Sequence, residues 1–135
     1  MSKKETFGLF IKERRLLRQI SLRKFAEQLD ISPVYICNME KNRNPAPNDD
    51  ILTRMAGLLL LTETETELLY DLAAKSKSTP TVSKDLPEYI MDRDIVRIAL
   101  RTAKDVDATD EEWQEFISNL EARRRKVQEE IERVS

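Results

Sequence analysis

Two short helical segments joined by a tight turn are the feature that most constrains how this chain folds. Ser21 is a suitable N-cap for the first segment, which continues with apolar residues at helical spacing. Asp30 and Ile31 form the turn. Ser32 then caps the second segment, and Pro33 stands at its first helical position, where a missing N–H costs nothing. Two helices joined this closely cross at a steep angle, which leaves the N-terminal half of the second helix free to project.

The remainder of the chain also has apolar residues at helical spacing, and nothing alternates with a period of two over a useful length. We therefore predict an all-α protein. Asn42 follows the third helix at a position that needs left-handed backbone, which Asn tolerates second only to Gly. Five helices are expected in the first half: at about residues 6–18, after Ser21, after Ser32, at about 49–61, and from a cap at Thr62 or Thr64 to about Lys75.

The chain divides by composition into three parts. Residues 76–84, SKSTPTVSK, contain no periodic apolar residue and are typical of a linker. We therefore predict one domain over residues 1–75, a linker over 76–84, and a helical C-terminal region over 85–135 that dimerises or receives a signal.

The last helix begins at a capping box formed by Thr109 and Glu112 and is expected to reach about Val134. Its apolar residues follow a near-heptad spacing, which is typical of a helix that pairs with a second subunit. The alternative for residues 113–120 is packing against their own chain. The residues predicted to form the dimer contact are Trp113, Phe116, Leu120, Val127 and Ile131.

Several functional classes are disfavoured by what the sequence lacks. It has no histidine, one cysteine and two glycines, so the commonest general base, the commonest metal ligand and a glycine-rich phosphate loop are all missing. We expect no enzyme activity, no metal site and no cofactor. The apolar run at residues 57–61 is far shorter than the roughly 20 residues that span a bilayer. No signal peptide is visible, and a single Cys37 fits a reducing cytoplasm.

Charge is distributed unevenly around a net value of −2. Residues 1–47 carry ten Lys and Arg against five acids, whereas the rest of the chain carries 13 basic and 20 acidic residues. This asymmetry predicts that the first half faces a polyanion and that the second half has another partner.

A spaced pattern runs through the first half: Ile-Lys-x-x-Arg, then Phe-Ala-x-x-Leu, a turn, Ser-x-x-x-Ile-x-x-x-Glu, and a basic loop ending in Pro. The pattern resembles the lambda-repressor-like (Xre-type) helix-turn-helix family. The resemblance implies a five-helix DNA-binding domain whose helix starting at Ser32 enters the major groove of double-stranded DNA. The matching residues are Ile11, Lys12, Arg15, Phe25, Ala26, Leu29, Ser32, Ile36, Glu40, Arg43 and Pro47.

The resemblance also implies a pairing between the arginine of the first helix and the glutamate that closes the third. Arg15 and Glu40 occupy those positions. We interpret the pair as a structural brace that fixes the angle of the recognition helix. The alternative is an ordinary surface ion pair, worth about 0–1 kcal/mol.

DNA contacts are expected from the outward side of the third helix and from nearby cations. Val34 can meet a thymine methyl group, and Asn38 can bond an adenine edge in bidentate fashion. Basic residues around the motif are expected to contact phosphates. The predicted DNA-binding residues are Lys12, Arg14, Arg23, Lys24, Ser32, Pro33, Val34, Tyr35, Cys37, Asn38, Lys41 and Arg43.

The sequence departs from the family pattern at three places. Leu22 stands where the family usually has Gln, Asn42 replaces the usual Gly, and Pro33 and Val34 replace polar residues that often read bases. These changes affect which DNA sequence is recognised more than whether DNA is bound.

The function predicted from sequence is a sequence-specific DNA-binding regulator, acting as a homodimeric repressor. One alternative is an antitoxin-type protein, in which residues 85–135 bind a protein partner while the first half regulates its own gene. A second alternative is a helix-turn-helix fold that has lost DNA binding and serves only assembly.

Overall fold

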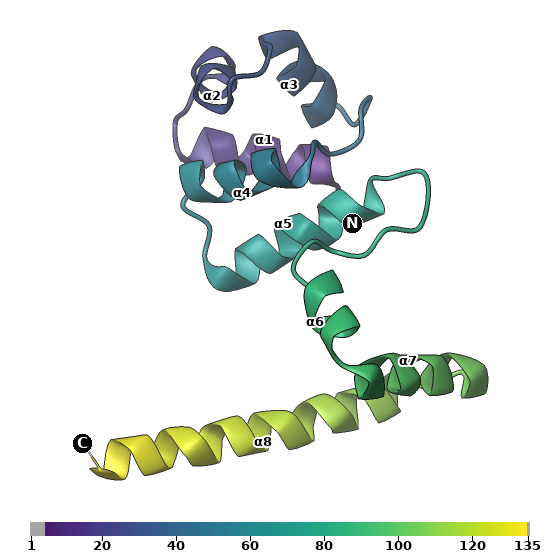
Figure 1. Ribbon diagram of the computed structural model, residues 1–135. Coiled ribbons are helices and arrows are strands. Elements are labelled where there is room, and N and C mark those ends of the chain that lie inside the picture. The colour runs from purple at the N-terminus through teal and green to yellow at the C-terminus, as the bar shows by residue number, and fades with distance from the viewer. Residues whose placement is uncertain (1–4, 135) are drawn as a thin grey trace. The chain divides into compact units, whose positions relative to one another are not determined.

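The computed structural model describes residues 5–134, which form eight α-helices and no strand (Figure 1). The all-α prediction is confirmed. The chain splits into two compact units, Met1–Tyr89 and Ile90–Ser135. The helices are α1 (Phe7–Leu17), α2 (Leu22–Leu29), α3 (Pro33–Glu40), α4 (Asp49–Leu58), α5 (Glu63–Lys75), α6 (Pro87–Asp92), α7 (Asp94–Val106) and α8 (Asp110–Val134).

The helices of the N-terminal unit begin where short polar side chains cap them. Ser21 accepts a hydrogen bond from the backbone N–H of Lys24, and Ser32 accepts one from that of Tyr35, both at 3.1 Å. Of the two residues predicted as the cap of α5, Thr62 and Thr64, it is Thr62 that caps the helix, and it forms a capping box with Glu65. The predicted caps at Ser21 and Ser32 are thus confirmed. Each cap satisfies a backbone N–H that the first helical turn leaves without a partner.

Helix α4 ends at Leu58, three residues before the predicted end. Leu60 adopts left-handed backbone with φ 50°, and the N–H of Leu61 bonds to the carbonyl of Ala56 at 3.1 Å. This closing bond satisfies a terminal carbonyl and turns the chain away from the helix. The apolar run of residues 57–61 concealed the end, because Leu60, and not a Gly or Asn, takes the left-handed position that closes the helix.

One hydrophobic core lies among the first five helices. Helix α1 packs against α3 and α5, α2 packs against α3 and α4, and α4 packs against α5. The apolar residues of α2 and α3 that form the contact between these two helices are at most 1% exposed: Phe25, Ala26, Leu29, Ile36 and Met39. The largest fully buried side chains are Phe10, Ile11, Phe25, Leu29, Ile36, Met39, Met55 and Leu69.

Residues 76–84, predicted to be a linker, pack against the N-terminal unit. The hydroxyl of Ser76 accepts the N–H of Ala46 at 2.9 Å, and the ammonium of Lys77 donates to the Ala46 carbonyl. Ser83 is buried and donates to the carboxylate of Asp71 on α5. The compact unit therefore extends past residue 75 to Tyr89. Polar side chains make these attachments, so hydrophobic periodicity does not reveal them.

The C-terminal unit has well-defined helices and no core of its own. Thr109 and Glu112 form the predicted reciprocal cap, with both backbone N–H bonds at 3.1 Å. Neither α7 nor α8 contains a buried residue. Trp113 packs edge-on against Phe116 with ring centroids 6.2 Å apart, yet the two side chains stay 37% and 54% exposed. The helices of the C-terminal unit therefore leave the apolar side chains of residues 113–120 exposed.

We predict that Gly8→Ala destabilises the N-terminal unit while Gly57→Ala does not. A Cβ atom on Gly8 would stand 2.4 Å from the carbonyl oxygen of Met39 and 2.6 Å from that of Glu40, so α1 and α3 would have to separate. The expected loss is about 2–3 kcal/mol of unfolding free energy. A Cβ on Gly57 meets nothing within 4 Å, and the helix gains about 0.4–1 kcal/mol.

Urea unfolding of both variants checks the prediction. Equal stability of the two variants would show that α1 and α3 do not depend on this close approach.

Candidate nucleic-acid interface

The crossing of α2 and α3 is set by a turn that contains one left-handed residue. Asp30 has φ 56°, and the N–H of Ile31 bonds to the carbonyl of Ala26 at 3.0 Å. Ala26 and Ile36 are completely buried, so the two helices approach closely at a small side chain. Because the buried side of α3 faces α1 and α2, its first turn is left at the surface.

The exposed edge of α3 presents a small group of predicted contact residues. Ser32, Pro33 and Val34 are exposed, and Val34 has 71% of its surface accessible. Cys37 and Asn38 are half-buried one turn later, as is Tyr35. Val34 and Asn38 are four residues apart, so their side chains are neighbours on one helix face. An apolar group and an amide therefore lie side by side, whereas the Ser32 hydroxyl is already engaged in capping.

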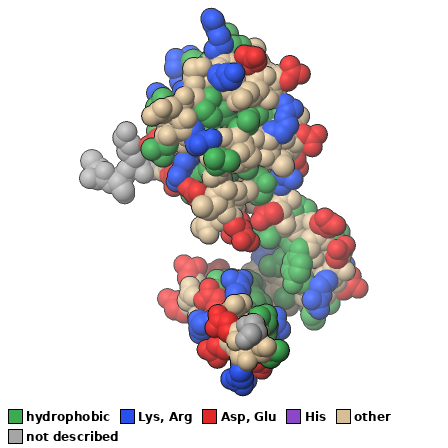
Figure 2. Space-filling view, turned by 90° about the vertical axis from the view of Figure 1, so that its left-hand side faces the viewer, with side chains coloured by type: hydrophobic (Ala, Val, Ile, Leu, Met, Phe, Trp, Pro, Cys, Tyr) green, Lys and Arg blue, Asp and Glu red, His purple; other side chains and the backbone are tan. Residues whose placement is uncertain are grey.

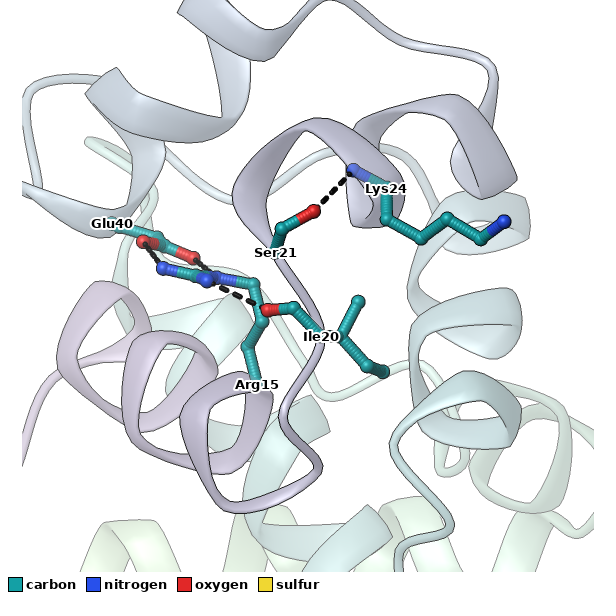
Figure 3. A network of polar contacts seen from close by, with 5 residues as sticks. All are labelled: Arg15, Ile20, Ser21, Lys24 and Glu40. Carbon is teal, nitrogen blue, oxygen red and sulfur yellow. Dashed lines mark hydrogen bonds and ion pairs between the residues drawn. The ribbon is translucent and has the colours of Figure 1, made fainter.

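A buried ion pair joins α1 to the end of α3 (Figure 3). The guanidinium of Arg15 donates to both carboxylate oxygens of Glu40, from Nε at 2.7 Å and from Nη2 at 3.0 Å. Its Nη1 donates to the carbonyl of Ile20, directly before the cap of α2, at 2.9 Å. Arg15 is 6% exposed and Glu40 is 8% exposed. One side chain thus connects α1, the turn before α2, and the last residue of α3.

Asn42 makes a second connection between α1 and the end of α3. Its backbone is left-handed with φ 60°, as predicted. Its side-chain oxygen accepts the N–H of Gly8 at 3.0 Å, and its amide donates to the hydroxyl of Thr6 at 2.9 Å. The sequence predicted only the backbone role of Asn42. The presence of Asn where the family usually has Gly is the signal that could have predicted a role for its side chain.

Arg14 lies apart from the other predicted phosphate contacts. It forms an ion pair with Glu65 of α5, and its guanidinium carbon stands 5.1 Å from the ring centre of Phe10. The pKa of Glu65 is lowered because the backbone N–H of Thr62 donates to its carboxylate, the Thr62 hydroxyl lies beside it, and Arg14 supplies an opposite charge. Arg14 is therefore engaged within the domain, on the side where α1 meets α5.

The other predicted phosphate contacts are exposed cations that make no ion pair with another described residue. Figure 2 shows Lys and Arg side chains on the upper part of the N-terminal unit, where α2 and α3 lie. Unpaired and exposed cations keep their full charge available for a polyanion. These residues are Lys12, Arg23, Lys24, Lys41 and Arg43.

Comparison with known proteins identifies the motif. Residues 11–65 match the family model described as helix-turn-helix. This segment belongs to the helix-turn-helix family. The predicted resemblance is thereby confirmed over the part of the chain that contains α2, α3 and α4.

Other comparisons add little. One chain of the solved SinR protein/SinI protein complex matches with 18% identity, over 88% of this chain and 98% of that chain, at a TM-score of 0.44. No curated protein sequence matches. The described residues contain no cluster of three or more His, Cys, Asp or Glu suited to a metal ion. No helix among them is long and apolar enough to cross a bilayer.

We predict that Arg15→Met and Glu40→Leu are each strongly destabilising and that the double variant is much less so. Each single change leaves one charge buried without its partner, which costs about 3–5 kcal/mol. The double change removes both charges and replaces them with apolar volume. Urea unfolding of the three variants measures the effect, and Arg14→Met, which removes the more exposed ion pair, is the matched control. Single variants as stable as this control would show that the buried pair does not brace the domain.

Proposed function

We propose that the protein is a sequence-specific DNA-binding transcriptional regulator that inserts α3 into the major groove. The observation that carries the proposal is the Val34–Asn38 edge of α3, where Val34 is exposed and Asn38 is half-buried, and which the buried Arg15–Glu40 pair holds against α1. A major groove admits an α-helix, and a methyl contact beside a bidentate amide is suited to reading neighbouring bases. The match of residues 11–65 to the helix-turn-helix family supports this orientation of α3.

Phosphate contacts would come from exposed cations on α1, on α2 and just after α3. Arg23 and Lys24 lie in the first turn of α2, where Leu22 replaces the usual Gln, and Lys41 and Arg43 follow the end of α3. Lys12 is exposed on α1. Charge at these positions sets the register and most of the affinity, while the α3 edge supplies sequence preference. Arg14 is left out of the proposed contact set because it pairs with Glu65.

We propose that the regulator acts as a homodimeric repressor in the cytoplasm. A two-fold dimer presents two recognition helices to two half-sites of an inverted repeat. The exposed apolar side chains of α8, with none buried in that helix, support the C-terminal region as the dimer contact. Repression is the simpler outcome, because occupancy of an operator is sufficient for it.

The antitoxin-type alternative rests on the same exposed apolar side chains. A protein partner covering residues 85–135 would bury them as a second copy would, and DNA binding would then serve autoregulation. Sedimentation of the pure protein separates the two alternatives. A monomer that is folded only over residues 1–89 would favour the partner-dependent alternative.

We predict that Asn38→Ala and Val34→Ala relax base preference, whereas Arg23→Ala weakens binding to all sequences. Loss of a bidentate contact should reduce discrimination at one base pair by about 1–3 kcal/mol. Loss of Arg23 should lower the slope of log affinity against log salt by about 1, because one fewer counterion is released. Lys104→Ala on α7 removes the same charge outside the proposed interface and is the matched control.

The measurement is binding to DNA selected from a random pool, followed across a salt series. A folded dimer that protects no DNA at low salt would contradict the proposed function. Unchanged specific binding in all three interface variants would contradict the assigned recognition surface.

A further inference from the structure

The surface of α8 carries a continuous seam with the spacing of a coiled coil. Its positions alternate in steps of four and three residues over more than three helical turns, which is the a and d pattern of a heptad repeat. Every seam residue is exposed within the chain. The seam consists of Trp113, Ile117, Leu120, Arg124, Val127, Ile131 and Val134.

The helices of the C-terminal unit leave this seam uncovered. No residue of α7 or α8 is buried, although Ile95 and Ile98 on α7 and Val127 and Ile131 on α8 are each at least half exposed. Hydrophobic side chains reach the surface of this unit in Figure 2 as well. Shallow hollows along α8 are lined by seam residues and by the residues beside them, including Arg123 and Glu130. A contiguous exposed seam of this kind marks an interaction surface.

The seam has one charged residue in its middle, and that residue decides the orientation of a self-paired α8. In a parallel pair, Arg124 would lie beside Arg124 of the second copy, and two like charges would be brought together in a desolvated seam. In an antiparallel pair an a position faces a d position. Arg124 can then lie across Val127 of the second copy, covering it with its aliphatic stem while the guanidinium reaches water. Self-pairing therefore favours the antiparallel orientation.

The residues that flank the seam select one antiparallel register. With Arg124 opposite Val127, Leu120 faces Ile131 and Ile117 faces Val134, and each pair occurs twice around the two-fold axis. The same register places Arg123 opposite Glu130 of the second copy, again twice.

A shift by one heptad toward the N-terminus reverses this charge complementarity. It would place Arg123 opposite Arg123 and Glu121 opposite Glu121, so both flanking pairs would carry like charges across the axis. Like charges in contact are unfavourable, whereas the first register joins opposite charges.

We propose that α8 pairs with α8 of a second copy in an antiparallel coiled coil, with Arg124 across Val127 and Arg123 across Glu130. The proposal rests on the dimer of the proposed function and adds its orientation and register. The partner of the seam is thus a second copy of this chain.

Charge reversal tests the register in the full-length protein. Arg123→Glu and Glu130→Arg each turn two attractive pairs into two repulsive ones, so each should weaken dimerisation roughly tenfold. The double variant restores opposite charges and should return the dimer dissociation constant to within about twofold of the native value. Arg125→Glu, which changes the same charge on the outward side of α8, is the matched control.

The readout is sedimentation equilibrium, with helix content followed by circular dichroism. A double variant no better than the single variants would overturn the register. A control that weakens the dimer as much as Arg123→Glu would do the same.

Spin labels test the orientation. A single label at Glu111→Cys in a Cys37→Ser background should give a distance of about 45 Å across the dimer, because the two labelled ends lie apart by about 29 residues at 1.5 Å each. A parallel pair would give about 10–20 Å, and that result would overturn the proposal, as would a monomer at all concentrations. The measurement contains no DNA. A 45 Å distance in a protein that protects no operator would therefore uphold the pairing and reject the proposed function.

Discussion

The buried pair of Arg15 and Glu40 is the interaction on which the rest of the N-terminal unit depends. It joins α1 to the last residue of α3, and the bond from Arg15 to the carbonyl of Ile20 adds the turn before α2. A buried ion pair contributes little net stability when compared with apolar residues, but it penalises every arrangement that separates its charges. Its effect is therefore to select one angle for α3, and the exposed edge at Val34 and Asn38 follows from that angle.

The two units solve the problem of burying apolar surface in different ways. The N-terminal unit completes a core within one chain, supplemented by polar attachments such as Ser83 to Asp71. The C-terminal unit caps the start of α8 with Thr109 and Glu112 but leaves the apolar side chains of α7 and α8 exposed. In the proposed dimer, burial there depends on association, so the stability of this unit should depend on protein concentration. The proposed function thus assigns recognition of DNA and recognition of a second chain to separate halves, in keeping with the uneven charge distribution.

Local chemistry explains which parts of the fold and site were predictable. The caps at Ser21, Ser32 and Thr62 depend on residues within three positions of each other, and a pattern of that length can be read directly. The positions of Arg15 and Glu40 were implied by a family resemblance. The engagement of Arg14 with Glu65 was not visible, because it joins residues about fifty positions apart whose charges look solvated in the sequence.

The sequence by itself determined the all-helical class, the starts of α2, α3 and α8, the helix-turn-helix motif and the near-heptad spacing of α8, because each depends on periodicity or on capping over short distances. Tertiary structure alone decided that residues 76–84 bond to Ala46 and α5, that the Asn42 side chain joins the end of α3 to the start of α1, and that the other helices of the C-terminal unit leave α8 uncovered. These outcomes depend on contacts between segments that are distant in the sequence, and the sequence of one segment does not specify which other segment it will contact.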